Sequence, residues 1–117
     1  MAALSTHVLD TVYGKPAKGV AIDLYVLRDG RRVHIKSAVT NADGRTDEPL
    51  LSADSLETGI YELTFGAGNY FRAAGAIIAS PAFLDEVVIR FGVSEPTENY
   101  HVPLLLSPYG YSTYRGS

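Results

Sequence analysis

Three histidines are the residues of this 117-residue sequence best suited to carry a proton near neutral pH. His7 lies in "LSTHVLD", His34 in "RRVHIK" and His101 in "YHVPLLL". A neutral imidazole can take a proton from water as the water attacks a carbonyl group, and an imidazolium can protonate a leaving group. His7 and His101 are therefore candidates for acid–base chemistry. His34 is flanked by basic residues near an expected hairpin tip, so we interpret it as a solvated surface residue.

Arg45 and the last four residues add further polar groups. Arg45 follows an Asp-Gly turn signal at 43–44, and its planar guanidinium is suited to holding a developing negative charge or a flat polar ring. The sequence ends on "YRGS", residues 114–117. A solvated surface role is the ordinary alternative for each of these residues, because a single residue type is weak evidence for a site.

Several other kinds of chemistry have no support in the sequence. There is no cysteine, so thiolate catalysis and cysteine-based zinc sites are excluded. "GAGNYF" lacks the third glycine of a dinucleotide fingerprint, and no G-x-S-x-G motif is present. Two histidines without a clear third ligand make a metal site unexpected. We predict an activity without metal or cofactor.

Composition limits the possible partners. The formal net charge is −3 and the ten Lys and Arg do not cluster, so no electrostatic footprint for nucleic acid exists. No apolar run approaches the roughly 18 residues of a membrane span. "MAALSTHVLD" has no basic region followed by an apolar stretch, which predicts a cytoplasmic protein without a secretory signal. The length predicts one domain, 1–117.

The segments around the candidate residues alternate apolar and polar side chains with the period of two that half-buried strands require. In 100–106 the core face is Tyr100, Val102, Leu104 and Leu106, which places His101 on the opposite surface. Pro103 removes one ladder donor, and this predicts an edge position or a bulge. The expected strands are 4–10, 20–27, 32–40, 60–65, 86–91, 100–106 and 111–115.

Turn signals separate these strands. "RDGR" at 28–31 and "NADGR" at 41–45 both predict hairpins, and Gly/Pro-rich turns are expected at 13–19 and 107–110. "GAGNYFRAAG" at 66–75 lacks alternation and ends on a glycine that could cap a short helix. The pattern predicts an all-β sandwich with one short helix.

Four segments together resemble the 5-hydroxyisourate hydrolases of the transthyretin-like family over essentially the whole chain. They are "LSTHVLD", "DGR", "GIYELTF" and "YHVPLLLSPYGYSTYRGS". The resemblance implies a transthyretin-like sandwich of two four-stranded sheets, about eight strands in all, with a helix near 67–75. It also implies a homotetramer, a dimer of dimers, with sites in a channel where subunits meet.

The resemblance further implies the reaction: water adds to C6 of 5-hydroxyisourate, the N1–C6 bond opens, and 2-oxo-4-hydroxy-4-carboxy-5-ureidoimidazoline forms in urate degradation. The residues that match the family's motifs would act as catalytic groups (His7, Arg45, His101 and Ser117) and as substrate-binding groups (His7, Arg45, Tyr114, Arg115 and Gly116). Either histidine could be the general base. Arg115 could bind substrate or tie down the terminus, and Gly116 would allow close backbone approach.

Two other functions remain as alternatives. A transthyretin-like carrier would hold a flat aromatic ligand in the same channel, and its channel should be lined by apolar groups. A purely structural β-sandwich module would leave all the histidines solvated. Two histidines, an arginine and a polar terminus favour the hydrolase.

Overall fold

The computed structural model describes residues 2–117. Nine strands and one helix make up this part of the chain. The elements are β1 (Ala2–Asp10), β2 (Lys15–Pro16), β3 (Ala21–Arg28), β4 (Arg31–Val39), β5 (Leu51–Ser52), β6 (Gly59–Phe65), α1 (Ala67–Ala73), β7 (Val87–Val93), β8 (Tyr100–Ser107) and β9 (Gly110–Thr113).

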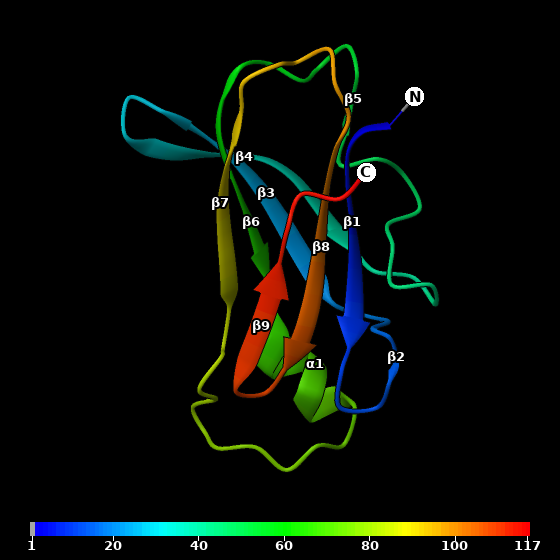
Figure 1. Ribbon diagram of the computed structural model, residues 1–117. Helices are drawn as coiled ribbons and strands as arrows, with labels where there is room; N and C mark the ends of the chain where they lie inside the picture. Colours follow the sequence, from blue (N-terminus) through cyan, green and yellow to red (C-terminus); the bar gives the residue numbers. More distant parts are fainter. Residues whose placement is uncertain (1) are drawn as a thin grey trace.

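The strands form two sheets that pack face to face (Figure 1). One sheet has the order β2-β1-β8-β9, with β5 also paired to β1, and the other has the order β4-β3-β6-β7. The predicted two-sheet sandwich with one short helix is confirmed. The first sheet has five strands instead of the expected four. The two-residue strands β2 and β5 are too short to leave an alternating pattern in the sequence.

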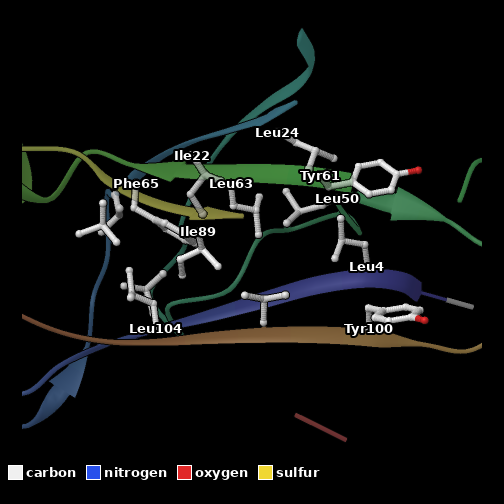
Figure 2. Close-up of a cluster of buried hydrophobic side chains, with 14 of the residues drawn as sticks. Leu4, Ile22, Leu24, Leu50, Tyr61, Leu63, Phe65, Ile89, Tyr100 and Leu104 are labelled. Atoms are coloured by element: carbon white, nitrogen blue, oxygen red, sulfur yellow. The ribbon is translucent and has the colours of Figure 1, made fainter. Parts of the chain in front are cut away.

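The core lies between the sheets and is built from the inward members of each alternating strand (Figure 2). Leu4 and Leu104 come from the first sheet, and Ile22, Leu63 and Phe65 come from the second. All five side chains are fully buried. Removing this apolar surface from water is the main source of stability and fixes which face of β1 and β8 points outward.

One of the two predicted hairpins forms. Asp29 and Gly30 both have positive φ angles, 53° and 76°, as a tight turn between β3 and β4 requires. The hairpin predicted at 41–45 is wrong, because its flanking strands β4 and β5 belong to different sheets. Asn41 instead organises a local turn: its Oδ1 accepts from the backbone N–H groups of Asp43 (2.9 Å) and Arg45 (3.2 Å).

Pro103 does not lie in an edge strand, so that expectation is wrong. β8 lies between β1 and β9, and no register shift occurs in either of its pairings. The last pair of the β8–β9 ladder is Leu104 with Thr113, so Pro103 is the first residue of β8 outside that ladder, and the Thr113 hydroxyl donates to the Pro103 carbonyl (2.8 Å). The missing N–H of the proline therefore removes no hydrogen bond from a β8–β9 pair.

The helix α1 is held by its contacts rather than by its own propensity. It has seven residues and no side-chain N-cap, whereas Tyr70 and Phe71 are buried against the sheets. Gly75 ends it with φ 86°, and the N–H groups of Gly75 and Ala76 donate back to Arg72 and Phe71, as expected from the sequence. In the described range the chain has no helix long and apolar enough to cross a membrane.

Asp10 ties the end of β1 to this helix. Its carboxylate, 1% exposed, accepts from the Tyr70 hydroxyl at 2.6 Å and from the backbone N–H groups of Val12 and Tyr13. Burial and the neighbouring Asp10 carboxylate raise the pKa of Tyr70, so the phenol stays protonated and remains a donor.

We predict that Tyr70→Phe lowers the free energy of unfolding by about 1.5–3 kcal/mol, because one hydrogen bond to a buried carboxylate is lost. Urea denaturation followed by circular dichroism measures this change. The control is Tyr25→Phe, since Tyr25 lies on the outer face of β3 and its hydroxyl makes no hydrogen bond within the described residues. Equal stability of the two variants would contradict the assigned role of the Asp10–Tyr70 contact.

Candidate active site

The parallel pairing of β1 with β8 places His7 and His101 on one surface. In the ladder Ser5 lies opposite His101, and His7 lies opposite Pro103. Leu4, Thr6 and Val8 fill the alternate positions of β1 and are buried, whereas Ser5 and His7 are half-buried. The strand period therefore directs both histidines to the outer face of the sheet, as predicted for His101.

His101 is fixed at one ring nitrogen by a hydroxyl group. The distance from Ser5 Oγ to His101 Nδ1 is 2.8 Å. The next pair along the ladder, Thr6 and Val102, also has a side-chain hydrogen bond. The buried Thr6 hydroxyl donates to the Val102 carbonyl at 2.6 Å. This second bond holds the two strands in register beside the ring.

Gly116 covers another edge of the same ring. Its N–H donates to the His101 carbonyl at 2.7 Å, so the chain end crosses β8 at this point (Figure 1). A Cβ atom added at Gly116 would lie 2.6 Å from His101 Cδ2, which is closer than real Cβ atoms approach. The close approach expected for Gly116 is present, and its partner is the imidazole.

Gly44 approaches His7 in a similar way. It has φ 75°, its carbonyl accepts from the Val8 N–H at 2.8 Å, and an added Cβ would lie 2.4 Å from the Val8 carbonyl oxygen and 3.3 Å from His7 Cδ2. Only glycine suits this position. The turn therefore packs against β1 and places the exposed Arg45, which follows it, near the histidines.

The electrostatics of His101 reflect this arrangement. Burial lowers the pKa of His101, and the positive charges of Arg45 and His7 lower it further. His101 is therefore predominantly neutral at pH 7. Since the folded-state pKa lies below the unfolded value of about 6.5, its contribution to stability is present above that pH and is lost as pH falls through the folded pKa.

Tyr114 and Arg115, unlike Gly116, do not lie against the His101 ring. Tyr114 is 62% exposed and lines, with Arg115, a groove against β7. Arg115 donates to Glu98 (3.1 Å) and to the Asn99 carbonyl (3.0 Å), and its guanidinium lies 4.1 Å from the centre of the Tyr100 ring. The carboxylate that holds Arg115 thus belongs to the same chain.

Ser117 is exposed and makes no hydrogen bond to His101 within the described residues. The site residues gathered by a single chain are accordingly His7, Arg45, His101 and Gly116. Tyr114, Arg115 and Ser117 lie beside this group rather than within it.

Ser5 contacts a candidate site residue, His101, and the sequence analysis missed it. A signal for it exists: Ser5 and His7 are two residues apart, so they share a face of β1. The sequence does not reveal that β1 and β8 pair in parallel with Ser5 opposite His101.

His34 lies on the other sheet and is exposed, as predicted. Its Nε2 contacts Asp23 (2.9 Å) and Ser37 (3.0 Å). The hydrogen bonds from Ser37 and His34 lower the pKa of Asp23. Across residues 2–117 no group of three His, Cys, Asp or Glu side chains is close enough together to hold a metal ion.

We predict that Arg45→Gln raises the pKa of His101, because one of the charges that disfavours the imidazolium is removed. The chemical shifts of the His101 ring protons, followed against pH by NMR, report the midpoint. Arg28→Gln, at the hairpin of the other sheet, is the matched control and should leave the midpoint unchanged. An unchanged midpoint in Arg45→Gln would show that Arg45 does not act on His101.

The chain is similar in sequence and structure to proteins of one family. The pattern of the HIUase/Transthyretin family matches residues 4–116. The chain is 57% identical to 5-hydroxyisourate hydrolase 2 of Rhizobium meliloti, over 97% of this chain and 95% of that protein. The structure of Klebsiella pneumoniae 5-hydroxyisourate hydrolase superposes with a TM-score of 0.77 at 38% identity, covering 97% of this chain and 98% of that one.

Sea bream transthyretin in complex with thyroxine superposes with a TM-score of 0.87 at 28% identity, over 98% of this chain and 95% of that one. The fold is therefore shared by proteins named as enzymes and by a transthyretin solved in complex with thyroxine. With the family's pattern spanning nearly all its residues, the chain belongs to the HIUase/Transthyretin family.

Proposed function

We propose that this protein hydrolyses 5-hydroxyisourate to 2-oxo-4-hydroxy-4-carboxy-5-ureidoimidazoline in purine degradation. The relatives that carry the name 5-hydroxyisourate hydrolase support the substrate. The observation that carries the proposal is the convergence of two imidazoles and one guanidinium on the outer face of β1 and β8. These groups are those that a hydrolysis by activated water needs.

His101 is the general base in this proposal. Its lowered pKa keeps the imidazole neutral and able to accept a proton, and its Nε2 has no hydrogen-bond partner in the described part of the chain. The Nε2 lone pair takes a proton from water as the water oxygen attacks C6. His7 then orients the water or protonates N1 as the C6–N1 bond breaks.

Arg45 faces the developing negative charge on the C6 oxygen. A fixed donor at such a position is worth about 10²–10³ in rate. The guanidinium also offers two parallel donors to a flat ring that carries carbonyl oxygens, which a lysine ammonium does not. Because Arg45 is exposed and held by a turn docked on β1, substrate can reach it without a change in the sheet.

The terminal residues complete the pocket. Gly116 lets the backbone lie against His101, and Tyr114 contacts the substrate ring once a neighbouring subunit closes the site. Ser117 is the proposed polar group at the rim. Arg115 anchors this segment through Glu98 and Tyr100, with substrate contact as its second role.

We propose a homotetramer, a dimer of dimers, whose subunits meet around the sites. Support comes from the large apolar side chains left exposed on and near β9. Patches of this kind on a soluble protein mark contact surfaces. The exposed residues are Phe83, Tyr109, Tyr111 and Tyr114.

A carrier of a flat aromatic ligand is the second candidate, favoured only by the structural similarity to transthyretin. A carrier site would present apolar groups to its ligand. The surface around His101 instead presents imidazole, guanidinium and hydroxyl groups. This polarity favours the hydrolase.

We predict that His101→Asn and Arg45→Lys each keep the tetramer and lose at least about tenfold in kcat/KM, since the base or the bidentate donor is removed. The assay follows freshly prepared 5-hydroxyisourate by ultraviolet absorbance, with an enzyme-free blank for its spontaneous decay. His34→Asn, a histidine on the other sheet, is the matched control. A full rate in either site variant removes that residue from the mechanism.

We predict that Gly116→Ala also lowers kcat/KM by about tenfold or more, because the added methyl group must displace the imidazole ring or the chain end. Gly110→Ala is the comparison, since the nearest atom to its added Cβ is a serine hydroxyl at 3.7 Å. The same assay serves both variants. Equal rates would mean that the His101 ring does not need its observed position.

A further inference from the structure

The Ser5 hydroxyl contacts the ring nitrogen of His101 that the proposed proton transfer does not use. It contacts His101 at Nδ1, at 2.8 Å, whereas the proton transfer proposed for His101 uses Nε2. The two nitrogens point to opposite sides of the imidazole ring. Ser5, on β1, thus contacts His101 on the side of the ring away from Nε2.

Both members of this hydrogen bond are held by rigid surroundings. Ser5 lies between the buried residues Leu4 and Thr6, and the Thr6 hydroxyl is bonded to Val102. The His101 backbone is held on its other side by Gly116. The Oγ–Nδ1 contact is therefore set by the sheet register and does not depend on a mobile loop.

A hydroxyl at Nδ1 bears directly on the protonation of the ring. When Nδ1 carries the proton and donates it to Ser5 Oγ, Nε2 has a free lone pair and can act as the base. After Nε2 has taken a proton from water, the Nδ1–H remains a donor and the hydrogen bond becomes charge-assisted. Serine is neutral, so it supports this tautomer without the opposing charge that an aspartate would add and that would raise the histidine pKa.

We propose that Ser5 is a positioning residue that holds His101 in the Nδ1–H tautomer, with the Nε2 lone pair directed at the reacting water. The inference deepens the proposed function, because it names the group that prepares the base of that reaction. Ser5 forms no covalent bond to the substrate in this assignment, and water alone attacks C6.

The test compares Ser5→Ala with the wild-type tetramer in two independent measurements. The ¹⁵N chemical shifts of the histidine rings at pH 8 identify the tautomer of His101, whether or not substrate is turned over. We expect Nδ1–H in the wild type and a shift toward Nε2–H in Ser5→Ala. We also expect kcat to fall roughly tenfold with KM nearly unchanged, because a wrongly placed proton disables a base without weakening substrate contacts.

Two further variants sharpen the result. Ser5→Thr retains a hydroxyl at the same position and should restore the wild-type tautomer and most of kcat. Ser37→Ala removes the serine hydroxyl that contacts His34 on the opposite sheet. It should change neither the tautomer of His101 nor kcat.

An Nε2–H ring in the wild type, with the Ser5 hydroxyl donating to Nδ1, would overturn the proposal. An unchanged His101 tautomer in Ser5→Ala, or a full kcat in that variant, would also overturn it. A covalent substrate adduct at Ser5, detected by mass spectrometry after rapid quenching, would also overturn it, because the serine would then be a nucleophile. If the tautomer shifts in Ser5→Ala but the wild-type protein does not accelerate hydrolysis, the role of Ser5 stands and the proposed function fails.

Discussion

The parallel pairing of β1 with β8 is the interaction on which the site depends. Most neighbouring strands of this sandwich are antiparallel, and these two are parallel with Leu4 opposite Tyr100 at one end and Asp10 opposite Leu106 at the other. The register sets Ser5 beside His101 and turns both to the outer surface. A slip of β8 by one residue would exchange its inward and outward faces, burying His101 and exposing Leu104. Core packing and site geometry are therefore fixed by the same contacts.

Close packing of backbone against the imidazole rings is the second constraint. At Gly116 the main chain comes so near the His101 ring that a side chain does not fit, and at Gly44 the Val8 carbonyl leaves no room for one. Burial is the largest cause of the lowered pKa of His101, and the charge of Arg45, which follows Gly44, lowers this pKa further. The chain end thus packs against the ring, whereas the turn at Gly44 brings a cation near it.

His34 and His101 have similar serine contacts but different surroundings. His34 and His101 each contact a serine hydroxyl, but the exposed His34 also contacts the Asp23 carboxylate, whereas His101 is half-buried with Arg45 nearby. Burial and the nearby guanidinium lower the pKa of His101. These two features distinguish His101 from a histidine on the exposed face of the other sheet.

The sequence alone was sufficient for the β-sandwich, for a short helix within 66–75 and for the outward direction of His101, because strand alternation, and its loss at 66–75, are local properties of the sequence. It also identified His7, Arg45 and Gly116 as site candidates through their motifs. It did not predict the contact of Ser5 with His101, the interior position of Pro103 or the turn at Asn41 that joins two sheets rather than closing a hairpin. Those features depend on which strands become neighbours and in what direction. That choice is made by the burial of side chains distant in sequence, so only the tertiary structure decides it.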